Sequence, residues 1–190
     1  LIFLVSDPLQ QKSYKPEGSG YVLDITFSND GNFVAGSTDD EGVFVVNLRS
    51  QTINQIINHN KAKSISFSPD GKFLSAHGYI YNLETNTQVM NFNDGGYTTY
   101  SPDGKLLASS TGKVYNLETG ATAHDFTSGN SVAFSPDGET LAIGGSRNRY
   151  YDRGSYKYTD PISIYSLKTG EKAGSMGGSQ TVNDIAYSPD

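Results

Sequence analysis

One stretch of the sequence concentrates side chains that are suited to binding another molecule. Between Ser146 and Pro161, four of the chain's 13 tyrosines stand among four basic residues. Tyrosine and arginine are enriched at binding hot spots, because they combine a large contact area with directed hydrogen bonds. The candidate partner-binding residues are Arg147, Arg149, Tyr150, Tyr151, Arg153, Tyr156, Lys157 and Tyr158.

This insertion admits more than one interpretation. Its loop could hold a partner protein, since binding sites usually lie on loops carried by a rigid scaffold. It could instead form a hairpin around Arg153 and Gly154 whose tyrosines pack on each other or on a neighbouring part of the fold. The interleaving of arginine and tyrosine would also permit RNA or an anionic ligand to bind by stacking.

The sequence gives catalysis little support. The three histidines, His59, His77 and His124, lie far apart and lack metal-ligand spacing. No G-x-S-x-G motif is present. The absence of cysteine excludes a disulfide framework, a thiol nucleophile and a cysteine zinc site. We therefore predict that the chain is not an enzyme and has no metal site and no cofactor.

Charge and hydropathy narrow the class of partner. The 190 residues carry a net charge of −6, which argues against a binder of duplex nucleic acid. The apolar opening "LIFLV", from Leu1 to Val5, is too short to span a bilayer. We expect the partner to be another protein or a multi-subunit complex, with no membrane, and with nucleic acid met only indirectly through an assembly. The sequence does not determine the cellular compartment, and the cytoplasm is favoured.

Two sequence motifs recur in alternation along the chain, and the structure that they form must position these residues. Variants of "AFSPDGETLAI" begin at Thr26, Ser66, Thr99 and Ala133, and a truncated copy begins at Ala186. Variants of "IYNLETG" fall between them, near Val43, Tyr79, Lys113 and Ser163. Two phrases that alternate with flexible spacing indicate a repeat architecture.

The physics of one repeat can be followed from Ser131. Residues 131–134 alternate as a half-buried strand should, and the sequence Ser-Pro-Asp-Gly then turns the chain. Pro136 presets φ, Asp137 can bond to the turn backbone, and Gly138 supplies the unusual φ. Residues 162–167 and 172–175 predict a third and a fourth strand. Each repeat is therefore expected to be a four-stranded antiparallel meander.

The "VAFSPDGxxLA" corner and the "xIYNLETG" strand and turn resemble the WD-repeat family and its looser bacterial and archaeal relatives. The resemblance implies an all-β fold: a β-propeller built of four-stranded antiparallel blades, with about four full blades and partial blades at both ends. It also implies a non-enzymatic protein-interaction scaffold that binds through blade-face loops. Two alternatives are a structural subunit of a large assembly, such as a translation initiation complex, and an enzyme or ligand binder that uses the central channel.

The sequence departs from the family's pattern in the third strand. It has no tryptophan, and the Trp-Asp ending is replaced by Val46-Asn47, Tyr81-Asn82, Tyr115-Asn116 and Tyr165-Ser166. The family's buried Asp–His–Ser–Trp network therefore cannot form. We expect aromatic packing between sheets instead, from equivalent inner positions at Phe27, Phe67, Tyr100, Phe134 and Tyr187. Two short connections, His77-Gly78 and Thr111-Gly112, predict two-residue hairpins.

The predicted repeat units cover approximately residues 20–59, 60–93, 94–127 and 128–178. Partial units are expected at 1–19 and 179–190 of one partial propeller spanning 1–190. A propeller protects its strand edges by closing into a ring. We expect the remaining blades to come from the rest of a longer chain or from a second copy.

Overall fold

The computed structural model describes residues 2–4, 12–14, 21–40, 42–50, 52–57, 62–145, 149–158, 160–178 and 180–188. These residues form strands, turns and extended segments, and no helix. Accordingly, the described part of the chain offers no helical segment able to cross a membrane.

Sixteen of the strands form four antiparallel sheets of four strands each, here called blades 1 to 4, which confirms the predicted meander. Blade 1 holds β3 (Val22–Phe27), β4 (Phe33–Thr38), β5 (Val43–Asn47) and β6 (Ile53–Ile57). Blade 2 holds β7 (Ile65–Phe67), β8 (Phe73–Ala76), β9 (Tyr79–Asn82) and β10 (Thr87–Asn91). Blade 3 holds β11 (Thr98–Tyr100), β12 (Leu106–Ser109), β13 (Lys113–Asn116) and β14 (Thr122–Asp125). Blade 4 holds β15 (Ser131–Phe134), β16 (Thr140–Gly144), β19 (Ile162–Ser166) and β20 (Lys172–Met176).

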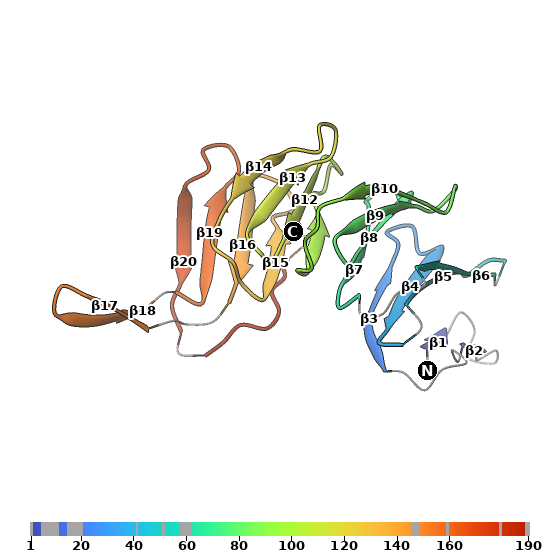
Figure 1. Cartoon of the computed structure of the whole chain (residues 1–190), viewed down its shortest axis with the longest axis horizontal. Coiled ribbons are helices and arrows are strands. Elements are labelled where there is room, and N and C mark those ends of the chain that lie inside the picture. The colour runs from blue at the N-terminus through green and yellow to red at the C-terminus, as the bar shows by residue number, and fades with distance from the viewer. Residues whose placement is uncertain are drawn as a thin grey trace.

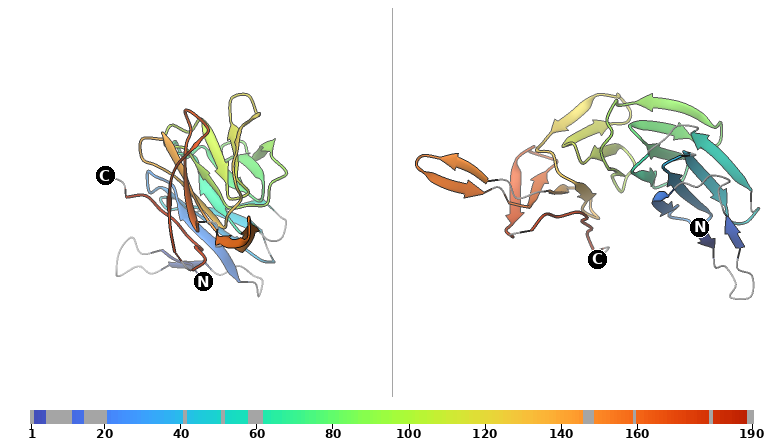
Figure 2. Two further views of the ribbon diagram at one scale, coloured as in Figure 1. Left: turned by 90° about the vertical axis from the view of Figure 1, so that its left-hand side faces the viewer. Right: turned by 60° about the horizontal axis from the view of Figure 1, so that its bottom comes forward.

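Two further strand pairs stand apart from the blades. The pair of β1 (Ile2–Leu4) and β2 (Lys12–Tyr14) precedes blade 1, and the pair of β17 (Arg149–Asp152) and β18 (Ser155–Tyr158) interrupts blade 4. The blades follow one another along an arc (Figures 1 and 2), and the first strands β3, β7, β11 and β15 contact one another in that order. This is the radial order that a propeller requires.

The Ser-Pro-Asp-Gly corner is held by one hydroxyl and one carboxylate. In blade 4, Ser135 Oγ donates to Asp137 Oδ1 at 2.5 Å, and the Thr140 amide donates back to Ser135 Oγ at 3.0 Å. Asp137 Oδ1 also accepts the amide of the next residue but one, as predicted, and Gly138 adopts a φ of 71°. The same hydroxyl–carboxylate pair recurs at Ser28, Ser68 and Ser101.

A second hydrogen bond ties each blade to the next. Ile65 N donates to Asp24 Oδ2 at 2.9 Å, and Thr98 N donates to Ser64 Oγ at 3.2 Å. Asp24 and Ser64 occupy the same repeat position, four residues before the corner serine. Blade 3 has Tyr97 at this position, which lacks the short oxygen-bearing side chain that accepts the bond in blades 1 and 2. In blade 4 the position is Ser131, whose Oγ accepts Ile185 N at 3.1 Å from the segment that follows the blade.

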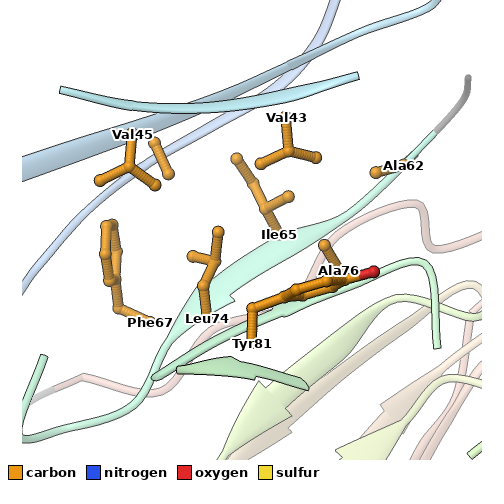
Figure 3. Close-up of a cluster of buried hydrophobic side chains, with 9 residues drawn as sticks. Val43, Val45, Ala62, Ile65, Phe67, Leu74, Ala76 and Tyr81 are labelled. Atoms are coloured by element: carbon orange, nitrogen blue, oxygen red, sulfur yellow. The ribbon is translucent and has the colours of Figure 1, made fainter. Parts of the chain in front are cut away.

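Apolar packing fills the spaces between blades. Figure 3 shows Val43 and Val45 of blade 1 facing Ile65, Phe67 and Leu74 of blade 2. All five side chains are buried. Burial of a side chain of this size contributes about 1.5–3 kcal/mol, so this packing is the main force that joins blades 1 and 2.

Between blades 3 and 4 a stacked aromatic pair joins the aliphatic packing. Phe126 stacks on Tyr165 with ring centroids 4.3 Å apart, and Phe134 and Leu141 are buried beside them. Tyr165 also bonds through its hydroxyl to Thr127 Oγ1 at 2.7 Å. Of the predicted inner aromatic positions, Phe134 lies in this interface, whereas the stacked rings of Phe126 and Tyr165 come from other positions.

The five equivalent aromatic positions differ in burial. Phe67, Tyr100 and Phe134 are buried as predicted, and Tyr187 is half-buried. Phe27 is 55 % exposed, which the sequence did not predict. The buried members pack against the blade that precedes them, and blade 1 is the first of the four described blades.

Blade 3 adds a polar network that the sequence did not predict. The buried Asp94 carboxylate accepts hydrogen bonds from Ser109 Oγ at 2.9 Å, Thr111 Oγ1 at 2.6 Å, Tyr115 OH at 3.0 Å and Gly96 N at 3.0 Å. Burial raises the pKa of this carboxyl, but the four donors outweigh burial and hold the pKa below its usual value. Aromatic packing is therefore not the only force that organises this blade.

One of the two short connections matches its prediction. His77 and Gly78 adopt φ values of 51° and 82°, as a two-residue primed turn requires. The second connection is a three-residue loop between β12 and β13, in which only Gly112 has a positive φ, of 98°. A two-residue turn would place Thr111 at positive φ, which a β-branched residue adopts only with strain.

The corner hydroxyl yields a first test. Changing Ser135 to alanine removes a donor to Asp137 and leaves the Thr140 amide without its acceptor. We expect Ser135→Ala to lower the free energy of unfolding by about 1–2 kcal/mol, measured by urea denaturation. Ser128→Ala, at an exposed serine outside any corner, is the control and should be neutral. Equal stability of both variants would contradict the role given to the corner.

The Asp94 network yields a second, pH-dependent test. Because the pKa of Asp94 is lower in the folded state than in the unfolded chain, its carboxylate stabilises the fold above a pH of about 4. That contribution is lost as the pH falls through the folded-state pKa. We expect Asp94→Asn to lower the free energy of unfolding by about 2 kcal/mol at pH 7, and by much less at pH 3. The exposed Asp40→Asn variant serves as the control, and a deficit for Asp94→Asn that does not change with pH would refute the assignment.

Candidate interaction surface

The insertion leaves blade 4 through a closed neck. Gly145 N donates to Pro161 O at 2.8 Å, directly beyond the paired strands β16 and β19. Lys172 Nζ on β20 lies 3.1 Å from Asp160 Oδ2. The base of the insertion is therefore closed by one backbone hydrogen bond and held to the sheet by one side-chain ion pair.

The insertion itself forms a β-hairpin, as one of its interpretations predicted. β17 and β18 pair antiparallel, with Arg153 and Gly154 at the turn. Their φ values of 45° and 85° are those of a primed two-residue turn. Figures 1 and 2 show the hairpin projecting away from the four blades. Its backbone therefore extends into space instead of covering a neighbouring blade.

The hairpin places most of the predicted binding residues. Arg149, Tyr150 and Tyr151 lie on β17, and Tyr156, Lys157 and Tyr158 lie on β18. The register sets Arg149 opposite Tyr158, Tyr150 opposite Lys157, and Tyr151 opposite Tyr156. Arg153 is exposed at the turn. Arg147 lies outside the described residues.

A cavity of about 550 Å³ lies where the inner strands of the blades meet. Hydroxyl, aromatic and proline side chains dominate its lining, and no charged side chain is among its described lining residues. Equivalent positions from successive units contribute to it: Thr26, Ser66, Thr99, Ala133 and Ala186.

The structure relates two carboxylates from distant units, which sequence reasoning missed. Burial raises the pKa of Asp24, and the charge of Asp184 adds to this effect, although hydrogen bonds from the amides of Ile65 and Ile25 oppose it. Asp24 and Asp184 occupy equivalent positions in "VLDITF" and "VNDIAY". This shared aspartate was the signal that could have revealed the relation.

The segment after blade 4 behaves as the start of another unit. Val182 N donates to Gly145 O at 3.0 Å, and Ser131 Oγ donates to Asp184 Oδ1 at 3.1 Å. Tyr187 OH bonds to Thr140 Oγ1 at 3.1 Å. The segment therefore lies along the inner side of blade 4, in the place that each first strand takes beside the preceding blade.

Comparison with known proteins agrees with this architecture. The model of the family described as "WD domain, G-beta repeat" matches residues 10–45 and 118–150. No curated protein matches the sequence. Among solved structures, the fold is similar to that of a Kuenenia stuttgartiensis hydrazine synthase chain, with a TM-score of 0.63 and 17 % identity. The match covers 90 % of this chain and 51 % of that one, so this chain spans about half the length of that relative.

At 17 % identity the structural likeness shows the fold alone. The family matches and the blades lead to a firmer conclusion, because the matched residues include strands of blade 1 and blade 4. WD repeats are in general non-enzymatic β-propeller scaffolds for protein–protein interaction. The chain is therefore similar to WD repeats over these two segments, and its four sheets are arranged as the blades of a β-propeller.

Proposed function

We propose that this chain is a non-enzymatic scaffold that binds a partner protein through its blade-face loops, above all through the hairpin at residues 146–161. The observation that carries the proposal is the projection of β17 and β18 from a closed neck. A hairpin whose base is held in this way has less backbone ordering left to do on binding, and a preorganised surface binds more tightly.

The composition of the hairpin indicates the kind of partner surface. Residues 146–161 contain four basic and two acidic side chains, a local charge of +2 in a chain whose net charge is −6. Four tyrosines accompany these charges. Such a surface fits a partner surface on which carboxylates alternate with apolar side chains. Arginine binds carboxylates in bidentate fashion, and tyrosine covers apolar area.

Charge reversal on the hairpin tests this function. We expect the double variant Arg149→Glu, Arg153→Glu to lose recovery of its partner at least about tenfold in quantitative pull-downs from the source cells, because a hot-spot residue is worth about 2 kcal/mol. The melting temperature should not fall, because Arg153 is exposed and the hairpin projects from the blades.

A matched control separates a specific site from a general charge effect. The double variant Arg49→Glu, Lys168→Glu makes the same change in net charge at exposed turn positions of blades 1 and 4. It should keep the partner. If both double variants lose the partner equally, or if the hairpin variant keeps it, the hairpin is not the binding site.

A further inference from the structure

The interface between blades 2 and 3 is packed less completely than its neighbours. Its buried apolar cluster contains only Ile80, Tyr100 and Leu107. The corresponding clusters contain nine residues between blades 1 and 2 and seven between blades 3 and 4. The space left over is a pocket of about 550 Å³, which we call the blade 2–3 pocket.

The pocket has apolar walls and an acidic rim. Val89, which is 51 % exposed, marks its opening on β10. The carboxylates of Asp70 and Asp103 stand in the corners of the two blades that flank it. The apolar wall residues are Phe73, Ile80, Val89, Met90 and Leu117.

The pocket also contains a buried hydroxyl with no hydrogen-bond partner. Tyr100 lines the pocket and is 7 % exposed, and its OH has no acceptor in bonding geometry. The nearby Ser75 hydroxyl is engaged with Thr98 Oγ1 at 2.9 Å. Burial raises the pKa of Tyr100, with a further contribution from the charge of Asp70, so the phenol stays a donor at neutral pH. A buried donor without an acceptor is unfavourable and is rare in folded proteins.

Comparison with the equivalent tyrosine of another unit explains why the Tyr100 hydroxyl has no hydrogen-bond partner. Tyr187 takes the place of Tyr100 in the segment after blade 4, and its hydroxyl bonds to Thr140. Phe73 of blade 2 stands at the position of Thr140 and offers no acceptor. By this equivalence the Tyr100 hydroxyl finds no acceptor on Phe73, and it lies buried close to Ser75.

The two rim carboxylates stay ionised at neutral pH, and each interacts with the charge of the lysine two residues further along, Lys72 or Lys105. Hydrogen bonds from the Ser101 hydroxyl and the Lys105 amide lower the pKa of Asp103. Partial burial raises the pKa of Asp70, but equivalent bonds from the Ser68 hydroxyl and the Lys72 amide hold it below its usual value. The Lys105 ammonium lies 3.8 Å from Asp103 Oδ2 with both side chains exposed, a weak pairing that a ligand cation can replace.

We propose that the blade 2–3 pocket binds a short segment of a partner protein in which an apolar side chain stands next to lysine or arginine. The apolar side chain fills the space between Phe73 and Met90, and the neighbouring cation meets Asp70 and Asp103. The pocket and the hairpin are separate surfaces of opposite charge, so this inference does not depend on the proposed role of the hairpin.

Selection from a library of short peptides displayed on phage tests the inference directly. The whole chain is the bait, and Val89→Lys is the counter-selection bait, because a lysine at the opening blocks the pocket and neutralises its rim. We expect the enriched peptides to carry an apolar residue beside lysine or arginine. In fluorescence polarisation with the labelled peptides, Val89→Lys should weaken binding at least tenfold.

Two further variants make the test specific. Ala123 occupies the same bulge position on β14 that Val89 occupies on β10, so Ala123→Lys is the matched control and should bind the peptides normally. Tyr100→Phe should bind the peptides as the wild type does, with an unchanged melting temperature, because the buried hydroxyl is out of a ligand's reach and phenylalanine already occupies this position at Phe67 and Phe134. The proposal is overturned if no peptide is enriched, if the enriched peptides lack this pattern, or if they bind Val89→Lys as well as the wild type. The hairpin double variant should bind the peptides as the wild type does, so the two proposals fail separately.

Discussion

The fold depends on the contact between one blade and the next. A four-stranded sheet has two faces, and a single small sheet buries too little apolar surface to be stable alone. Phe67, Tyr100 and Phe134 are each covered by the preceding blade, and the difference between buried Phe67 and exposed Phe27 shows what that contact provides. The hydrogen bonds accepted by Asp24 and Ser64 then fix the register between neighbours, since packing alone has no preferred direction.

The interfaces between blades solve the same problem with different side chains. Aliphatic residues contribute to the packing between blades 1 and 2 and between blades 3 and 4, and a stacked pair of rings, Phe126 and Tyr165, is added in the second of these interfaces. Blade 3 stabilises its own loops with the Asp94 network, while the interface before it keeps a pocket and an unpartnered hydroxyl on Tyr100. Natural proteins rarely leave a buried donor unpaired without a reason, so this irregular interface is a more informative place to look for function than the regular ones.

The features that sequence could predict are those that depend on a few neighbouring residues. The Ser-Pro-Asp-Gly corner, the four-stranded meander and the turn at Arg153 and Gly154 are set by local backbone chemistry, and the structure confirms them. The Asp94 network joins residues up to 21 positions apart, and the relation of Asp24 to Asp184 spans most of the chain. The first contact needs the whole of blade 3 to be folded, and the second needs different units to be brought together. The pocket was missed for the same reason, because no single repeat contains both of its walls.

The place of the insertion in blade 4 follows from which parts of a blade are held by local contacts and which by contacts with neighbouring blades. First strands are committed to contacts with neighbouring blades, and the corners are fixed by their serine and aspartate, so neither can accept extra residues easily. The connection between the second and third strands varies from the two-residue turn at His77 and Gly78 to the long hairpin of blade 4, yet the paired strands on either side keep the same register. A neck closed by the Gly145–Pro161 hydrogen bond lets this connection grow without disturbing the sheet. The site where the scaffold tolerates variation is therefore also the site where a binding element can be added at the smallest loss of stability.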